Sequence, residues 1–308
     1  MKLQSEFREF DKAIKLSEAK KEKILKSREA VRNKIREHFK NTLGVNQPKF
    51  RIQGSFTLNT ALMPIGNNEV DIDDGLYLMH INTDDHSQWP APRKVHKDIM
   101  EALKNHTQNG CEDKTSCVHV IYKNDYHIDI PVYILTSDNH AWLGNKKTNE
   151  WELSDSKDFK DWFFKNRKDD QTTRLVRYLK AWRDYNGCDF TSIELTILVV
   201  LYHVQADDDF LSLKNTVETI YQNLYRNPSV KKPVSPWEDL WGEKTAEQKQ
   251  QLVDLFKSLS KDLNSAYACM SEHRASLILR EIFGDRFPIV EDNSAVSINN
   301  WRSKPWRM

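Results

Sequence analysis

Two short groups of residues in the first third of the chain have the types and spacing needed for phosphate chemistry. Gln53-Gly54-Ser55-Phe56 offers backbone N–H groups and a hydroxyl beside a glycine that lets a ligand approach closely. Sixteen residues after Ser55, Asp71 and Asp73 lie two apart in a stretch with strand character, residues 70–78. Period two places both carboxylates on one face. Because like charges repel, a cation between them is favoured; the alternative is a solvated edge strand or an acidic turn.

A third carboxylate follows on another predicted strand, residues 126–134. Ile128 and Ile130 alternate onto one face, which leaves His127 and Asp129 on the other. Asp129 could complete a triad with the first two carboxylates, or it could be an edge charge. We interpret His127 as structural.

These groups fit together as a phosphoryl-transfer site. Backbone amides at a turn that leads into a helix bind phosphate oxygens. Three carboxylates could hold two Mg²⁺ ions against the same phosphates, and such a metal pair clamps the attacking and leaving oxygens of an in-line displacement. In that arrangement Asp129 is the natural neighbour of an attacking 3′- or 2′-hydroxyl, and loss of any one carboxylate would be severe.

The elements that must position these residues can be outlined from the pattern. Residues 2–42 contain no Pro or Gly and carry apolar residues at helical spacing, which predicts one long helix that ends near Gly44. A helix of that length is expected to act as a spine spanning two lobes, with a coiled coil as the alternative. A short strand at 50–52, the Gly54-Ser55 turn and a helix over 56–62 follow.

Residues 93–105 are predicted to form a helix, and residues 118–122 a strand beside 126–134. From about residue 158 to 283 the pattern is helical, interrupted by a loop at 228–236 that contains three prolines.

Composition narrows the function classes. The 308 residues are 39% hydrophobic and 30% charged, which is typical of a globular protein. The net charge is only +1, but residues 1–50 hold fourteen Lys/Arg against seven Asp/Glu. This excess is either a solvated helix face or a positive field for a polyanion such as a nucleoside triphosphate or nucleic acid.

Several features argue for a cytoplasmic protein with no zinc site. The four cysteines are scattered without metal-ligand spacing, and the ten histidines form no Cys/His cluster. There is no apolar run near twenty residues and no secretion signal at the N-terminus, so no membrane association is expected.

The motifs resemble a known family. Gln53-Gly54-Ser55-Phe56 with Thr60, then residues 70–78 (VDIDDGLYL), and later Asp129 are similar to the polymerase-β-like nucleotidyltransferases. Within them, the pattern looks like the bacterial cGAS/DncV-like nucleotidyltransferases (CD-NTases), close to the cyclic GMP–AMP synthase branch. The resemblance covers essentially the whole chain.

The resemblance implies an α+β architecture with a mixed-sheet catalytic lobe, a long N-terminal spine helix and a C-terminal α-helical lobe. We therefore expect residues 1–150 to contain the spine and catalytic lobe, and residues 151–308 to complete the nucleotide pocket.

The resemblance also implies the roles of individual residues. Asp71, Asp73 and Asp129 would be catalytic and would bind two Mg²⁺ ions, with Mn²⁺ as a possible substitute. Nucleotide contacts would come from Gln53, Gly54, Ser55, Lys180, Ser192 and Asp285. Without the resemblance, Lys180 is an amphipathic surface lysine, Ser192 a helix N-cap and Gly284-Asp285 a helix-ending turn.

The implied activity is synthesis of a cyclic di- or trinucleotide from NTPs (ATP, GTP or both) with release of pyrophosphate. In this family the product signals in anti-phage (CBASS) defence to a downstream effector, and regulatory partner proteins are possible. Two features limit the comparison: Leu58 stands where some relatives have an aromatic residue, and no Cys/His zinc insertion of the animal DNA-sensing type is present. Conjugation of the C-terminus is not expected, because the family uses a small terminal residue and the sequence ends in Met308. The alternatives are a transferase that adds nucleotides to RNA or protein, and a non-catalytic nucleic-acid-binding module.

Overall fold

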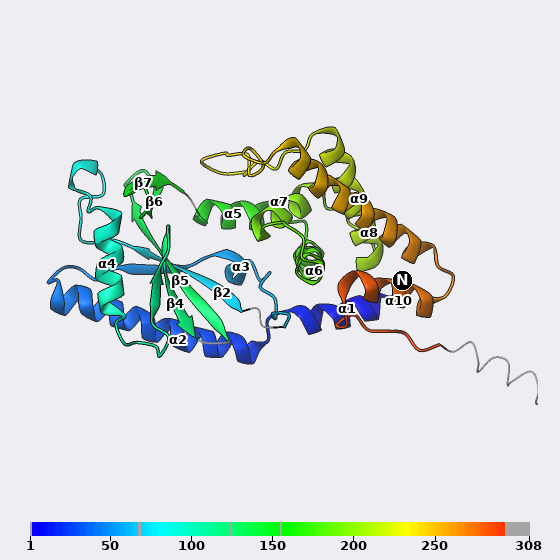
Figure 1. Ribbon diagram of the computed structural model, residues 1–308, viewed down its shortest axis with the longest axis horizontal. Helices are drawn as coiled ribbons and strands as arrows, with labels where there is room; N and C mark the ends of the chain where they lie inside the picture. Colours follow the sequence, from blue (N-terminus) through cyan, green and yellow to red (C-terminus); the bar gives the residue numbers. More distant parts are fainter. Residues whose placement is uncertain (1, 67–68, 123–124, 155, 293–308) are drawn as a thin grey trace, which may run out of the picture.

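A sheet lobe and a helical lobe lie side by side along the long axis of the molecule (Figure 1). The computed structural model describes residues 2–66, 69–122, 125–154 and 156–292. Within these ranges, no helix is both long and apolar enough to cross a membrane.

The N-terminal spine is two helices, α1 (Gln4–Ile14) and α2 (Glu18–Glu37), followed by a π-helical turn over His38–Thr42. The prediction of one uninterrupted helix over residues 2–42 is therefore wrong in detail. Lys15 is extended, and the Ser17 side chain caps α2 by accepting from the Lys20 N–H at 3.3 Å. The break allows the Leu16 N–H to donate to the Ala61 carbonyl at 3.2 Å, a tertiary contact that local pattern does not reveal.

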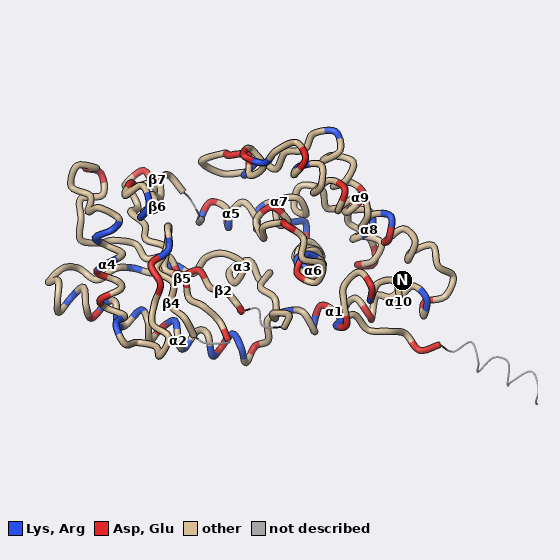
Figure 2. Tube along the Cα trace, viewed as in Figure 1, with Lys and Arg blue, Asp and Glu red and all other residues tan. Residues whose placement is uncertain are grey.

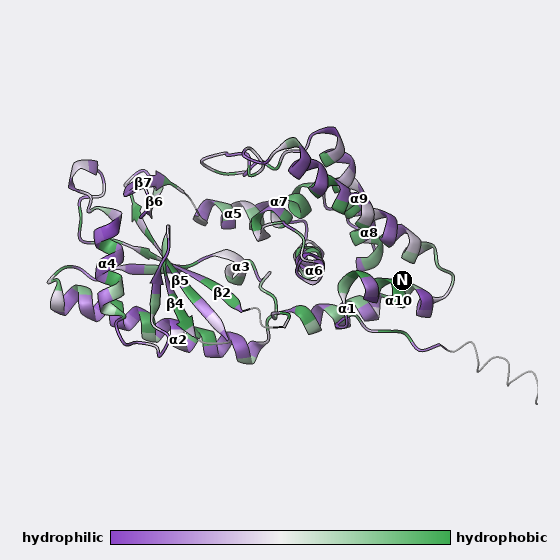
Figure 3. Cartoon of the chain, in the orientation of Figure 1, coloured by the Kyte–Doolittle hydropathy of each residue, from purple (hydrophilic) through white to green (hydrophobic). Residues whose placement is uncertain are grey.

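The two spine helices bury their apolar faces in different cores. Phe7, Phe10 and Ile14 of α1 pack with the helical lobe. In contrast, the buried side chains of α2, among them Val31 and Ile35, pack against the sheet. Most other residues of α2 are hydrophilic, and much of its ribbon is purple in Figure 3. The spine thus joins the lobes because each half is amphipathic toward a different partner.

The sheet is mixed and has seven strands, with the order β1-β2-β5-β4-β3 and a β6-β7 extension from β5. β2 and β5 are parallel, and the other pairs are antiparallel. The strands are β1 (Lys49–Ile52), β2 (Val70–Tyr77), β3 (Cys111–Asp113), β4 (Cys117–Tyr122), β5 (Tyr126–Leu135), β6 (Ala141–Asn145) and β7 (Glu150–Leu153).

Two helices complete this lobe, and both differ slightly from their predicted bounds. The short α3 (Gly54–Thr57) begins at the Gly-Ser turn itself, whereas α4 (Pro92–Ala102) has proline in its first turn. Apolar side chains of β2, β4 and β5, including Ile72, Val120 and Ile128, form the core between the sheet and the helices α2 and α4.

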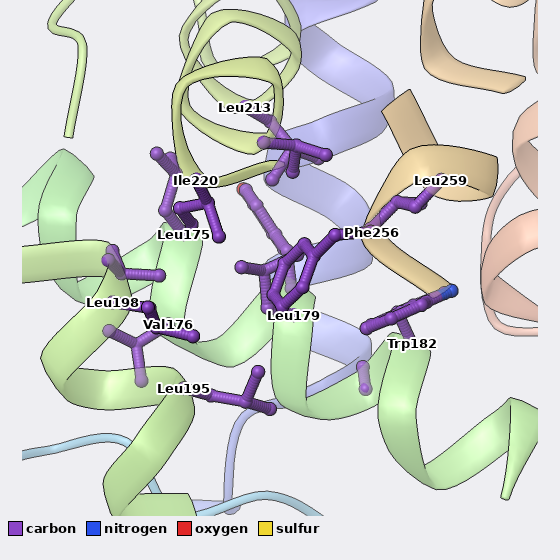
Figure 4. Close-up of a cluster of buried hydrophobic side chains, with 14 of the residues drawn as sticks. Leu175, Val176, Leu179, Trp182, Leu195, Leu198, Leu213, Ile220, Phe256 and Leu259 are labelled. Carbon is purple, nitrogen blue, oxygen red and sulfur yellow. The ribbon is translucent and has the colours of Figure 1, made fainter. Parts of the chain in front are cut away.

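The described part of the second lobe is built from helices, as predicted, but the loop predicted at 228–236 extends over residues 227–245. Its helices are α5 (Ser156–Asn166), α6 (Asp170–Asn186), α7 (Ser192–Tyr202), α8 (Asp209–Arg226), α9 (Ala246–Ala268) and α10 (Glu272–Phe283). Leu175, Leu179 and Trp182 of α6 converge with side chains of α7, α8 and α9 in one apolar cluster (Figure 4). This packing makes α6 the central helix of the lobe. The α+β class and the two-lobe plan predicted from the sequence are confirmed.

Candidate active site

A cavity of about 960 Å³ is lined by residues of both lobes. Its sheet-lobe wall carries acidic residues of β2 and β5. In Figure 2, red segments lie along the strands of the sheet lobe, and blue segments are frequent along α2. Cationic residues of the helical lobe, Lys180, Arg183 and Lys232, also line it. A cavity with carboxylates and cations on different walls suits a ligand that carries both metal and phosphate groups.

The three predicted carboxylates are brought together by strand register. Asp73 on β2 and Asp129 on β5 are direct partners in the parallel ladder. Two residues earlier on the same strands, Asp71 pairs with His127. All four side chains therefore share one face of the sheet and line the cavity. The Asp71 side chain is 67% exposed, whereas that of Asp129 is 19% exposed.

The surroundings of Asp73 disfavour its ionised form. Burial, followed by the charges of Asp129 and Asp71, raises its pKa to about 6, and Lys180 opposes the rise. Such a cluster of mutually repelling carboxylates is relieved by a bound cation.

The Gly54-Ser55 turn lies directly against this group. Gly54 has φ +62°, and a Cβ there would lie 2.2 Å from Asp73 Oδ2. The Gln53 N–H donates to the Asp73 carbonyl at 2.9 Å, which ties the turn to β2. Glycine is therefore required at this position both by the backbone conformation and by the close approach of the carboxylate.

The side chain of Gln53 has a structural role. It is 8% exposed, its Nε2 donates to the Tyr77 hydroxyl at 3.2 Å, and its Oε1 accepts from the Tyr133 hydroxyl at 3.1 Å. Gln53 does line the cavity, as predicted, but its amide is committed to the two tyrosines beneath the turn.

Lys180 is fully buried at the junction of the lobes, not on the surface. Its Nζ donates to the Thr60 carbonyl at 2.8 Å, and burial, followed by repulsion from Arg183, lowers its pKa to about 7. Two arginines of the helical lobe contact the same segment, residues 59–63. Arg177 donates to the Asn59 carbonyl at 2.6 Å, and Arg286 donates to the Met63 carbonyl at 2.8 Å. The segment after the Gly-Ser turn is thus held by three cations.

Ser192 lines the cavity in the first turn of α7, but it does not cap that helix. The cap is Thr191, which forms a capping box with Glu194. The N-cap expected at Ser192 from the local sequence therefore lies one residue earlier. The Ser192 hydroxyl accepts from Arg183 Nη1 at 3.0 Å, which places a guanidinium beside it on the helical-lobe wall of the cavity.

Asp285 lies away from these residues. Its side chain is 95% exposed, pairs with Arg280 at 3.2 Å and is not among the residues that line the cavity. The structure therefore does not bring Asp285 together with the other predicted nucleotide contacts.

Several wall residues were not predicted from the sequence. His127, interpreted as structural, lines the cavity, contacts Glu69 and lies 3.4 Å (Nδ1–Oδ1) from Asp71. Arg183 and Phe159 also line it. The only sequence signal for His127 was its place on the same strand face as Asp129; nothing local marked the others.

Comparison with known proteins bears on these assignments. Residues 48–133, which contain the Gly-Ser turn and all three carboxylates, match the model of the nucleotidyltransferase domain of cyclic GMP-AMP synthase DncV-like proteins. Residues 48–133 form a DncV-like nucleotidyltransferase domain. The family resemblance seen in the sequence is thereby confirmed.

The similarity to named relatives extends beyond residues 48–133. The chain is 25% identical over 279 residues to a c-di-GMP synthase of Roseivirga ehrenbergii, with 76% of this chain and 71% of that protein covered. It is 26% identical over 184 residues to a cyclic GMP-AMP synthase of Escherichia coli, with 45% of this chain and 43% of that protein covered.

Solved structures show that the fold around the DncV-like domain is also shared. The crystal structure of Vibrio cholerae DncV, a cyclic AMP-GMP synthase, has a TM-score of 0.80 at 20% identity and covers 93% of this chain and 97% of that chain. Escherichia coli DncV bound to 3′-deoxy GTP has a TM-score of 0.72 at 21% identity, with 89% and 93% covered. The sheet lobe, spine and helical lobe thus form one shared architecture.

Proposed function

We propose that this chain condenses nucleoside triphosphates into a cyclic dinucleotide and releases pyrophosphate. The observation that carries the proposal is the pairing of Asp73 with Asp129, beside Asp71, on one cavity wall that also holds the Gly54-Ser55 turn. The names of the relatives, a c-di-GMP synthase and a cyclic GMP-AMP synthase, support this product class.

The donor set fits divalent metal ions, Mg²⁺ above all, with Mn²⁺ as a substitute. Asp71, Asp73 and Asp129 supply the hard oxygen ligands that these ions prefer. Burial and the neighbouring carboxylates raise the pKa of Asp73, and a bound cation would offset both effects. As they stand, no three His, Cys, Asp or Glu side chains in the described ranges are grouped closely enough to hold an ion. A pair of bound ions would activate the attacking hydroxyl and neutralise charge on the phosphates.

The protein's own residues would bind and orient the triphosphate. Gly54 and Ser55 open α3 and line the cavity together with Asp73, so their backbone N–H groups would bind phosphate oxygens there. From the helical lobe, Lys180 and Arg183 supply positive charge, and the Ser192 hydroxyl is already fixed by Arg183. Asp129 would lie next to the attacking 3′- or 2′-hydroxyl. Positioning and charge complementarity of this kind account for most of phosphoryl-transfer catalysis.

The size of the cavity is compatible with nucleotide substrates. Sites for single small ligands usually enclose about 300–1,000 Å³, and this cavity, at about 960 Å³, is at the upper end. Its apolar walls, which include Leu58, Phe159 and Ile193, suit nucleobases. From the family resemblance we also propose a cytoplasmic role in anti-phage signalling, with a downstream effector that senses the product.

An α-³²P-labelled NTP mixture with Mg²⁺ tests the proposal. After phosphatase treatment, thin-layer chromatography should show a small labelled product that resists the phosphatase, because a cyclic product has no terminal phosphate. The same reaction supplied with RNA and protein should leave both unlabelled. Label in a macromolecule, or no resistant product with any NTP pair, would reject the cyclase in favour of a polymer-modifying transferase or a non-catalytic module.

A further inference from the structure

A buried histidine stands behind one of the three carboxylates. His119 on β4 is 4% exposed and is the direct cross-strand partner of Asp129 on β5. The two side chains meet at 2.5 Å between His119 Nδ1 and Asp129 Oδ1. His119 is not among the residues that line the cavity, so it has no direct contact with a ligand there, and its side chain hydrogen-bonds to Asp129.

The register places this contact in a continuous row. Asp73, Asp129 and His119 occupy matching positions on the neighbouring strands β2, β5 and β4. A carboxylate accepts and does not donate, so Nδ1 carries the proton and the imidazole donates to Oδ1. The His119 ring also contacts the ring of His127, with 4.2 Å between the ring centroids and an interplanar angle of 56°.

Asp129 is further enclosed by Cys117, two residues before His119 on the same strand. The Cys117 thiol is buried, and burial together with the nearby charge of Asp129 raises its pKa. The Asp129 carboxylate, held by His119, is 19% exposed. An aspartate without such partners rotates about its Cβ–Cγ bond and loses conformational entropy when it binds an ion.

We propose that His119 is a positioning residue that presets the Asp129 carboxylate for a divalent ion. By taking Oδ1, the imidazole fixes the rotation of the carboxylate before the ion arrives. Partners that orient metal-binding groups in this way commonly change metal affinity by about 10- to 100-fold when they are removed. The inference rests on the proposed function only in that it takes Asp129 to be an ion-binding group.

The chain contains a matched control pair. His96 on α4 contacts Asp113 on β3 through the same atoms, Nδ1 and Oδ1, at 2.7 Å, and His96 is fully buried. Neither residue lines the cavity. Substitutions at His96 therefore report the structural cost of losing a buried His–Asp hydrogen bond without any effect on the carboxylate row.

The test is a Mn²⁺ titration of the full chain, followed by the EPR signal of free Mn²⁺, with a non-reactive NTP analogue present. His119→Leu removes the donor at similar volume. His119→Asn keeps an amide near the Nδ1 position, and His119→Gln moves it to the Nε2 position. We expect His119→Leu and His119→Gln to raise the Mn²⁺ dissociation constant about 10- to 100-fold. His119→Asn should stay within about threefold of the unmodified chain, and His96→Leu should have no effect on the constant.

Unchanged Mn²⁺ affinity in His119→Leu would overturn the proposal, as would equal affinities of the Asn and Gln variants. If His119→Leu does not fold, the Asn–Gln comparison decides alone. The titration involves no turnover, so a chain that makes no cyclic dinucleotide but shows this pattern would reject the proposed function and leave the inference standing.

Discussion

At the scale of single residues, the site combines groups that would be unfavourable in isolation. Asp73 carries a raised pKa because it is buried beside two other carboxylates, and Lys180 carries a lowered pKa because it is buried beside Arg183. Both shifts disfavour the charged forms that phosphate and metal binding need. Ligands would restore those charges, so binding and protonation must be linked.

Lys180 provides a pH-dependent prediction. Its pKa in the free protein is about 7, so above pH 7 the amine is mostly neutral and must take up a proton when it meets a triphosphate. We therefore expect NTP affinity to fall as pH rises from 7 to 9, by up to about tenfold per unit. Isothermal titration calorimetry at pH 8 in buffers of different ionisation enthalpy should show net proton uptake, which Lys180→Met should abolish. Proton release or no exchange at pH 8 would contradict this assignment.

Gly54 provides a steric prediction. Gly54→Ala places a Cβ 2.2 Å from Asp73 Oδ2 in a backbone with φ +62°, so the turn or the carboxylate must move. We expect at least about a 100-fold loss of kcat, since displacements of about 1 Å at a reacting group can have that effect. Gly44→Ala is the control, because Gly44 has φ +67° and open space around it. Equal activity in the two variants would show that the close contact is unimportant.

At the scale of elements, buried polar contacts to α1 and α8 fix the central helix α6 within the helical lobe. Arg177 forms an ion pair with Asp11 of α1 at 2.7 Å, and Arg174 forms one with Asp209 of α8 at 2.6 Å. Asp209 also accepts from Gln171 and Tyr178, at 3.0 and 2.9 Å. Because Lys180 lies on the same helix, these contacts also determine where it meets the Gly-Ser segment.

Asp209→Asn tests this network. Burial alone would raise the pKa of Asp209, but hydrogen bonds from Arg174 and Gln171 outweigh it and leave the pKa lowered. The ionised form thus stabilises the fold above the unfolded pKa near 3.9, and this contribution is lost as pH falls through the lower folded value.

At pH 7, urea denaturation should show that Asp209→Asn lowers the free energy of unfolding by about 3–5 kcal/mol, because Arg174 is left buried without its partner. The neighbouring Asp208→Asn should change it little, since Asn caps α8 as well as Asp does. Equal stability of the two variants would mean that the buried pair does not support α6.

At this scale the sequence predicted most helices and strands, but not the contacts and breaks that depend on how they pack together. The carboxylate strands and the helical second half were readable because alternation and helical spacing are local patterns. The break between Ile14 and Glu18 depends on backbone pairing with residues 61–63, and the His119–Asp129 contact depends on strand register. Both arise from tertiary packing, so neither has a local signal. The alternation of its strand already marked Asp129 as a possible third carboxylate, and the family resemblance then implied its catalytic role.

At the scale of the whole molecule, two separate apolar cores hold a polar site between them. One core lies between the sheet and α2, and the other contains α1 with the helical lobe. The shared architecture with Vibrio cholerae DncV, at a TM-score of 0.80, extends over both lobes. The cavity needs both, because the carboxylates come from one lobe and Lys180, Arg183 and Ser192 come from the other.

We propose that Asp71, Asp73 and Asp129 carry out nucleotidyl transfer that ends in a cyclic dinucleotide. Mass spectrometry of phosphatase-treated reactions tests it most directly, with the unmodified chain and Asp73→Asn each incubated with NTPs and Mg²⁺. Asp73→Asn should fold at least as stably, since it removes a buried carboxylate repelled by Asp129 and Asp71. We expect a cyclic dinucleotide mass from the unmodified chain and none from Asp73→Asn; the same product at a similar rate from the variant would contradict the account.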